Sequence, residues 1–181
     1  MYGKLTGLKR REVDSLERLY RRRVPREWVA THELLSEIAA RSAALGRRIG
    51  VLIDRAGHVE RVILGDAKRL GLPDLSGERR AAERFRGLRL VATQLHASDL
   101  DGAVLTDLVR FRLDMVVQVD VGDAGELTWV RRAHLLPDNP ERKKYLVLPP
   151  VRPTALDRTF LDEIAALERS SRRPRRKRSR T

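Results

Sequence analysis

The chain has 181 residues, a length that accommodates one domain of ordinary size and a tail. Hydrophobic residues make up 41% of it but aromatic residues only 4%, so its core must consist mainly of Leu, Val, Ile and Ala. The absence of cysteine excludes disulfides, cysteine-ligated zinc, iron–sulfur clusters and thiol catalysis. No apolar run approaches the length of a membrane span, and the N-terminus lacks a signal-peptide core. We therefore expect a cytoplasmic protein without a membrane span.

The formal net charge of +13 is unevenly distributed. Residues 169–181 include eight basic residues and no acid, so the remainder carries only +5. Such a block favours binding to a polyanion, because each phosphate that it neutralises releases condensed counterions. The alternative is a solvated, disordered tail without a specific partner. The tail residues that we expect to bind RNA are Arg172, Arg173, Arg175, Arg176, Lys177 and Arg178.

The first predicted element is an amphipathic helix over residues 9–23. One of its faces is apolar at helical spacing, and the arginines lie mostly elsewhere. Pro25 disfavours helical geometry in the residue before it, so the helix should end near Arg23. The apolar face consists of Val13, Leu16, Leu19 and Tyr20.

A second helix is predicted over residues 32–45. Thr31 is its expected N-cap, because a threonine hydroxyl can accept a hydrogen bond from a free N–H of the first turn. Gly46 is its expected end, since glycine readily adopts the left-handed conformation that follows many helices. The residues expected to point inwards are Leu34, Leu35, Ile38 and Leu45.

The sequence pattern then changes to strands and turns over residues 48–148. Gly57 and Gly125 are suited to the turns of two hairpins. Short runs rich in branched residues indicate strands at 49–53, 59–64, 88–95, 115–121 and 127–135, with a short edge strand at 145–148. Helices are predicted over 101–111, and over 154–168 leading into the basic tail.

This order of elements predicts an α/β protein of α+β character, with a mixed β-sheet of about five strands and flanking helices. Two hairpins and one crossover helix are typical of a sheet with both antiparallel and parallel pairs. We expect one folded domain over residues 1–168 and a basic tail over residues 169–181.

No motif for nucleotide binding or catalysis is present in the sequence. A P-loop requires GxxxxGK[ST], and the single Gly-Lys pair, Gly3-Lys4, is followed by Leu5. A guanine-specific NKxD motif requires Asn before Lys, whereas the single asparagine, Asn139, precedes Pro140. No GxSxG nucleophile elbow occurs. We therefore expect a chain that is not an enzyme and binds no cofactor.

The four histidines lie far apart in the sequence. Metal ligation by histidine requires clustering or a fixed spacing. Each histidine stands next to a turn or a strand end, which favours a surface or capping role. No metal ligand is assigned, although convergence in space remains open. The residues are His32, His58, His96 and His134.

Several stretches resemble the N-terminal region of HflX-type ribosome-associated GTPases. No single stretch is diagnostic, but their order agrees over most of residues 7–168. They are LERLYRRRVP (16–25), IGVLIDRAGHVERVILGDAKRLGLPDL (49–75), RGLRLVATQLHASDL (86–100), LTDLVRFRLD (105–114), HLLPDNP (134–140) and YLVLPPVRPTALDRTFLDEIAALE (145–168).

The resemblance implies a cytoplasmic, ribosome-binding protein. Members of this family bind the large ribosomal subunit, help to dissociate or rescue stalled ribosomes, and contact ribosomal RNA through this domain. Their GTPase domain, which holds GTP and magnesium, follows in sequence, whereas the basic tail here departs from that continuation. We therefore expect a monomeric domain that binds the large subunit, cut off from its GTPase domain. The alternative is a stand-alone basic nucleic-acid-binding protein derived from that domain.

Many members of the HflX family carry potential metal ligands in an arrangement that resembles the metal motif of JAMM-type peptidases. These ligands lie at the end of the third strand and at the start of the next helix. The matching residues here include Ala92, Gln94 and Val104. Alanine and valine cannot ligate a metal and glutamine is a poor zinc ligand, so the resemblance implies no zinc site there.

Arginines of the first helix are the second candidate group for binding RNA. Arginine makes forked contacts with phosphate oxygens, and these residues are denser than folding requires. The alternative is ion pairing with Glu17, Asp14 or neighbouring strands. Trp28, in the loop that follows, either stacks on a base or packs against the first two helices. The arginines are Arg18, Arg21, Arg22 and Arg23.

Overall fold

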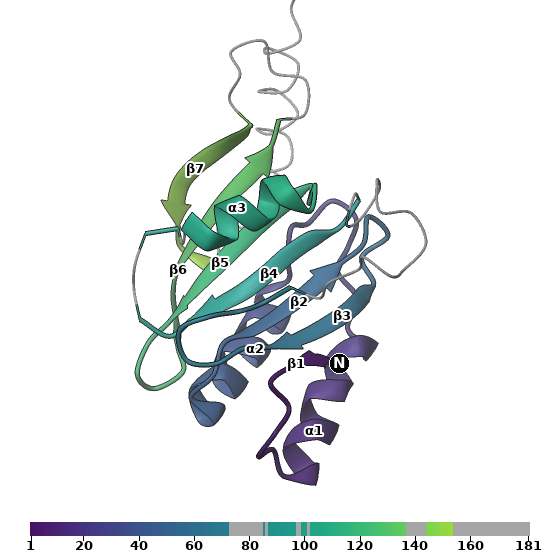
Figure 1. The fold of residues 1–181 in the computed structure, drawn as a ribbon, viewed down its shortest axis with the longest axis vertical. Helices are drawn as coiled ribbons and strands as arrows, with labels where there is room; N and C mark the ends of the chain where they lie inside the picture. The colour runs from purple at the N-terminus through teal and green to yellow at the C-terminus, as the bar shows by residue number, and fades with distance from the viewer. Residues whose placement is uncertain (73–84, 86, 97–98, 101, 137–143, 154–181) are drawn as a thin grey trace, which may run out of the picture.

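The computed structural model describes residues 1–72, 85, 87–96, 99–100, 102–136 and 144–153. They form an α+β fold in which one seven-stranded mixed sheet has α-helices on both faces (Figure 1). The helix predicted over 154–168 and the tail over 169–181 lie outside these residues. No helix in the described part is long and apolar enough to cross a bilayer.

The strands of the sheet follow the order β1-β3-β2-β4-β5-β6-β7. The pairs β1–β3 and β4–β5 are parallel, and the other neighbours are antiparallel. Helix α3 (Gly102–Arg110) makes the crossover that the parallel pair β4–β5 requires. The strands are β1 (Tyr2–Gly3), β2 (Ile49–Ile53), β3 (Val59–Leu64), β4 (Arg89–Gln94), β5 (Met115–Val121), β6 (Leu127–Leu135) and β7 (Tyr145–Val151).

The predicted fold class is confirmed, but the sheet is larger than predicted. Strand β1 is too short to show a sequence pattern, and it forms because Gly3 lies against the backbone of Leu64 with a φ of 103°. Strand β7 extends beyond the predicted end at residue 148 to Val151, through Pro149 and Pro150. This is possible because β7 is the last strand of the described sheet, where a missing N–H costs no hydrogen bond.

The first helix ends earlier than predicted. Helix α1 spans Arg10–Glu17, and the chain continues as a 3-10 turn, η1, over Arg18–Arg21. The tighter turn brings Tyr20 to β3, where its hydroxyl accepts a hydrogen bond from the Val62 amide at 3.2 Å. Arg23 then pairs with His58 in a β-bridge, so the helix predicted as far as residue 23 is replaced by extended chain.

Helix α2 (His32–Leu45) has the predicted bounds. The Thr31 hydroxyl accepts a hydrogen bond from the Leu34 amide at 3.1 Å, which confirms its capping role. Gly46 adopts the left-handed conformation, with φ 60° and ψ 28°. Both ends of this helix are therefore determined by residues next to it in sequence.

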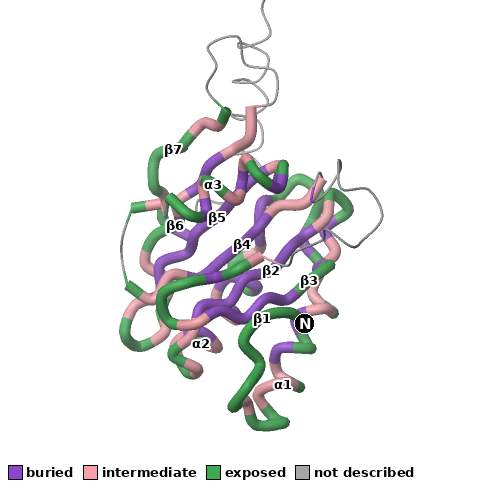
Figure 2. Tube along the Cα trace, in the orientation of Figure 1, coloured by how far each residue is buried: buried purple, intermediate pink, exposed green. Residues whose placement is uncertain are grey.

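Two apolar clusters lie on the two faces of the sheet. One packs beneath α1 and α2 and includes Val51 and Val117, and the other packs beneath α3 and includes Leu52 and Val116. Successive strand residues point to opposite faces, which explains why neighbours in sequence belong to different clusters. Figure 2 shows β2 and β5 buried along their lengths, because both of their faces are covered.

A buried set of hydrogen bonds connects the end of α2 to the sheet. The Thr93 hydroxyl accepts from the Ile49 amide at 2.8 Å and lies 2.8 Å from the Ser42 hydroxyl. Arg48 is fully buried and donates from Nε to the Thr93 carbonyl at 2.9 Å and from Nη1 to the Lys68 carbonyl at 3.1 Å. These bonds satisfy polar groups that would otherwise be buried without partners.

Thr93→Val should lower the free energy of unfolding by about 1–3 kcal/mol, because valine fills the same volume and makes none of these hydrogen bonds. Urea denaturation measures the loss. The matched control is Thr106→Val in α3, where the hydroxyl is exposed and bonds the Gly102 carbonyl at 2.8 Å. Its effect should stay within about 0.5 kcal/mol. Equal losses in the two variants would contradict a special contribution of the buried hydroxyl.

Candidate functional site

The four arginines of the first-helix group lie on η1 and the two residues after it. Leu19 is the buried residue of η1, so the side of η1 opposite Leu19 faces solvent. Arg18, Arg21 and Arg23 are exposed, whereas Arg22 is half-buried. The structure therefore divides the predicted group into three surface residues and one residue that contacts α2.

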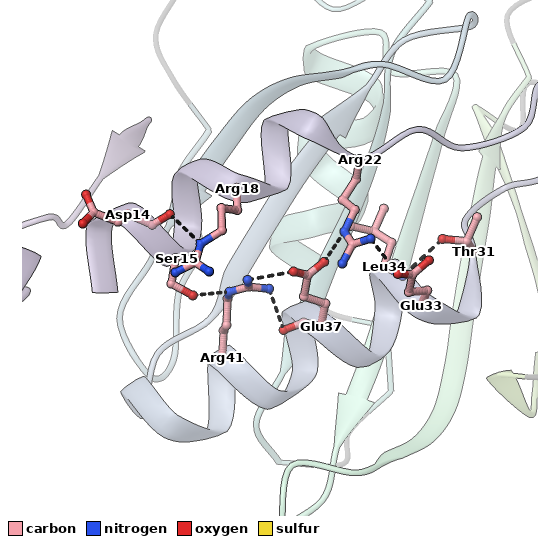
Figure 3. Close-up of polar contacts among 9 residues, drawn as sticks. All are labelled: Asp14, Ser15, Arg18, Arg22, Thr31, Glu33, Leu34, Glu37 and Arg41. Atoms are coloured by element: carbon pink, nitrogen blue, oxygen red, sulfur yellow. Dashed lines mark hydrogen bonds and ion pairs between the residues drawn. The ribbon is translucent and has the colours of Figure 1, made fainter. Parts of the chain in front are cut away.

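Arg22 fastens the chain after η1 to α2 through two ion pairs (Figure 3). Its Nη1 lies 2.6 Å from Glu33 Oε1, and its Nε lies 2.6 Å from Glu37 Oε2. Glu37 also pairs with Arg41, whose Nη2 lies 2.7 Å from Glu37 Oε1. Arg41 Nε in turn donates to the Ser15 hydroxyl of α1 at 2.7 Å. Arg22 thus belongs to a network that joins three segments.

The network shifts the pKa values of Glu37 and Arg22. Burial raises the pKa of Glu37, but the hydrogen bonds and charges of Arg22 and Arg41 outweigh this effect and hold that pKa below its usual range. The pKa of Arg22 is raised, chiefly by its hydrogen bond to Glu37. The ion-pairing alternative therefore holds for Arg22, but its partners lie in α2 rather than at Glu17 or Asp14.

The three exposed arginines of this group and the nearby exposed Arg26 are together called the arginine strip. Residues 18–26 contain five arginines and no acid. Arg18 donates only a long hydrogen bond, 3.4 Å, to a backbone carbonyl. The side chains of Arg21, Arg23 and Arg26 make no hydrogen bond or ion pair within the described part of the chain. The strip consists of Arg18, Arg21, Arg23 and Arg26.

Trp28 lies just beyond the strip in sequence. It is 38% exposed, so a large part of the residue is open to solvent. The predicted RNA-binding residues of the basic tail cannot be compared with this surface. Arg172, Arg173, Arg175, Arg176, Lys177 and Arg178 all lie outside the described residues.

Polar side chains also gather at the carboxyl ends of β4 and β5, and no site was predicted there from the sequence. Gln118 and Asp120 are 1% and 0% exposed and share the α3 face with Val116. The strand register places Gln94 beside Asp120, and Arg131 opposite Gln118. Arg131 Nη1 makes an ion pair with Asp120 Oδ2. The available signal was the alternation of polar and apolar residues in the strand MVVQVDV.

The β2–β3 hairpin brings together Asp54, His58 and Glu60. One ligand atom from each of them lies within 4.8 Å of the other two. The side chain of His58 is 46% exposed, as expected for a histidine at a turn, but its two carboxylate neighbours were not predicted. The overlooked signal was the pattern D-x-x-x-H-x-E across a single hairpin.

An open pocket of about 600 Å³ lies between α2 and the β5–β6 hairpin. His32, Glu126 and Arg152 are among the residues that line it. Arg152 donates to the Thr128 carbonyl at 3.2 Å and stacks 4.1 Å above the ring of Trp129.

No protein family compared with the chain matches it, and no curated protein does. One solved structure resembles it, the solution structure of a protein from Salinibacter ruber (strain DSM 13855). The two share 18% sequence identity, over 70% of this chain and 92% of that chain, with a TM-score of 0.34. A TM-score of this size does not establish a shared fold.

Arg22→Ala should lower the free energy of unfolding at neutral pH by about 1 kcal/mol, a modest value because part of the side chain is exposed to solvent. A carboxylate with a lowered pKa stabilises the fold above its ordinary pKa, and this contribution is lost as the pH falls through the lowered value. The difference in stability from wild type should therefore shrink when the pH is lowered well below 4.5, the ordinary pKa of the glutamate side chain.

Urea denaturation at neutral and acidic pH measures this effect. The control is Arg21→Ala, which removes an equal charge from the exposed strip and should change stability by less than about 0.5 kcal/mol. If Arg22→Ala lowers the free energy of unfolding equally at both pH values, the stabilisation does not come from the ion pair between Arg22 and Glu37.

Asp120→Ala should lower the free energy of unfolding by about 3 kcal/mol, because it leaves the Arg131 guanidinium largely buried without its carboxylate. The double variant Asp120→Leu/Arg131→Met removes both charges and should recover much of that loss. Thermal and urea denaturation of the three proteins test the coupling. If the double variant is less stable than Asp120→Ala, the loss in Asp120→Ala does not come from leaving the Arg131 charge unpaired.

Proposed function

We propose that this chain binds RNA through the arginine strip, and that its target is ribosomal RNA of the large subunit. The observation that carries the proposal is the strip itself, where guanidinium groups project from a stretch without any acid. The ribosomal target rests on the resemblance of the sequence to the N-terminal domain of HflX-type GTPases. The proposed setting is the cytoplasm, with the chain acting as a monomer.

The physical basis for affinity is charge. Arg21, Arg23 and Arg26 are free to make forked contacts with phosphate oxygens, since none of them is occupied by an acid in the described structure. Each phosphate that is neutralised releases condensed counterions, so affinity should fall steeply with salt. Such contacts position an RNA backbone but carry little sequence information.

The strip is also held in place, which reduces the conformational entropy lost on binding. Arg22 attaches the strip to α2 through Glu33 and Glu37, and Tyr20 attaches it to β3. Arg23 is fixed further by its β-bridge to His58. The fold thus presents these cations from a rigid backbone, while Trp28 offers a partly open ring for stacking.

The alternative function is a stand-alone nucleic-acid-binding protein with no preference for ribosomes. The same arginine strip supports it, because phosphate contacts do not distinguish one RNA from another. A comparison of large subunits with unrelated RNA separates the two. GTP hydrolysis is not proposed for these residues, since the sequence contains neither a P-loop nor an NKxD motif.

The double variant Arg21→Ala/Arg23→Ala should bind large ribosomal subunits at least about tenfold more weakly at low salt. The slope of log affinity against log salt should become shallower by about 1.4–1.8, the value for the loss of two phosphate contacts. Co-sedimentation at several salt concentrations measures both quantities. The matched control is Lys68→Ala/Arg69→Ala, which removes two exposed charges elsewhere and should bind like wild type.

Three further results bear on the proposal. Unchanged affinity and slope in Arg21→Ala/Arg23→Ala would remove the strip from the binding surface. Equal affinity for large subunits and for unrelated RNA would favour the stand-alone alternative. Removal of residues 169–181 measures the contribution of the tail, and loss of all binding on that removal would assign the interaction to the tail instead of the folded domain.

A further inference from the structure

We propose that Asp54, His58 and Glu60 form a binding site for a divalent transition-metal ion, with zinc as the best match. The site lies at the tip of the β2–β3 hairpin. This inference does not rest on the proposed RNA-binding function. It rests on the way the hairpin brings three potential ligands together.

The turn of the hairpin holds Asp54 and His58 side by side. The Asp54 amide donates to the His58 carbonyl at 3.0 Å, and the Gly57 amide donates to the Asp54 carbonyl at 3.1 Å. Gly57 has a φ of 88°, and an added Cβ would lie 1.8 Å from the Val24 carbonyl oxygen. The turn is therefore closed by its own backbone and packed against the chain that carries the arginine strip.

A β-bulge supplies the third ligand. Ile53 pairs with Val59 and Leu52 pairs with Arg61, so Glu60 has no residue opposite it. A bulge of this kind changes the direction of a side chain, and here Glu60 lies close to the other two ligands. Glu60 is exposed and makes no side-chain hydrogen bond or ion pair within the described residues, so its carboxylate is available.

The separation of the ligand atoms fits a metal. Asp54 Oδ2 lies 3.1 Å from His58 Nδ1. Two ligands at zinc–ligand distances of about 2.0–2.1 Å in tetrahedral geometry lie about 3.3 Å apart, so this pair is already close to the required spacing. All three ligand atoms lie within 4.8 Å of one another, and rotation of the exposed Glu60 side chain can complete the set.

The choice of ligands favours zinc and related ions over magnesium or calcium. Imidazole nitrogen suits zinc, copper, nickel and iron, whereas magnesium and calcium prefer sites made entirely of oxygen. One nitrogen and two carboxylate oxygens leave a fourth position open for water or another ligand. A divalent cation would also relieve the repulsion between Asp54 and Glu60.

Both oxygens of the Asp54 carboxylate contact His58, which orients them. Asp54 Oδ1 accepts a hydrogen bond from the His58 amide at 2.8 Å, which leaves Oδ2 directed to the imidazole ring. Arg89 approaches from β4, but its Nη1 donates to the Asp54 backbone carbonyl at 3.0 Å and its Nε to the Val29 carbonyl at 2.8 Å. Arg89 thus makes no hydrogen bond to the Asp54 carboxylate within the described residues, although the two charges interact. A bound metal ion would take the place of the proton between Asp54 Oδ2 and His58 Nδ1.

Titration of the chelator-treated chain with zinc chloride in a calorimeter tests the site. Wild type should bind one zinc ion, and His58→Ala and Glu60→Gln should each weaken binding at least about tenfold. Glu60→Gln is the more secure variant, because the Glu60 side chain makes no hydrogen bond or ion pair within the described residues. Cobalt(II) should give a visible absorption band with wild type that is lost in His58→Ala.

The matched control is His96→Ala, which removes an exposed histidine outside the cluster and should bind zinc like wild type. Arg21→Ala/Arg23→Ala should also bind zinc normally, which separates this site from RNA binding. The proposal is overturned if wild type shows no saturable binding of one zinc ion. It is equally overturned if Glu60→Gln and His58→Ala bind as wild type does, or if His96→Ala loses as much affinity as His58→Ala.

Discussion

Segments far apart in sequence meet at the buried hydrogen bonds around Thr93 and Arg48. The Thr93 hydroxyl joins β4 to the start of β2 and lies next to Ser42 of α2, while Arg48 reaches the chain beyond β3 through the Lys68 carbonyl. These groups are buried, so each would be costly without its partner. The position of α2 on the sheet and the alignment of β2 with β4 therefore depend on one another.

This alignment extends from the core to the surface where we place function. Strand β2 determines the register of β3, and the bulge in that register determines where Glu60 lies. The tip of the same hairpin pairs with Arg23, and Arg22 next to it is fastened to α2. The arginine strip and the Asp54–His58–Glu60 cluster are thus neighbours across one β-bridge. Both lie on or beside the same hairpin, although the ligands proposed for them carry opposite charges.

The arrangement also separates arginines that stabilise the fold from arginines that are free to bind. Arg22, Arg48, Arg89 and Arg131 contact carboxylates or carbonyls of other segments. Arg21, Arg23 and Arg26 lie on the surface without such contacts in the described residues. A high arginine content alone is therefore a weak indication of nucleic-acid binding. The location of the unpaired guanidinium groups supports the arginine strip as the proposed binding surface.

Local chemistry was sufficient to predict much of the fold from sequence. The bounds of α2 follow from Thr31 and Gly46, and β2, β3, β5 and β6 follow from short runs of branched residues between turns. The two-residue β1 and the 3-10 turn after α1 were missed, because contacts with β3 stabilise them. The partners of Arg22 and the burial of Asp120 likewise depend on side chains brought in from other segments. Helix caps and periodicity act over a few residues and can be predicted from sequence, whereas strand register, bulges and ion-pair partners were decided only when distant segments packed together.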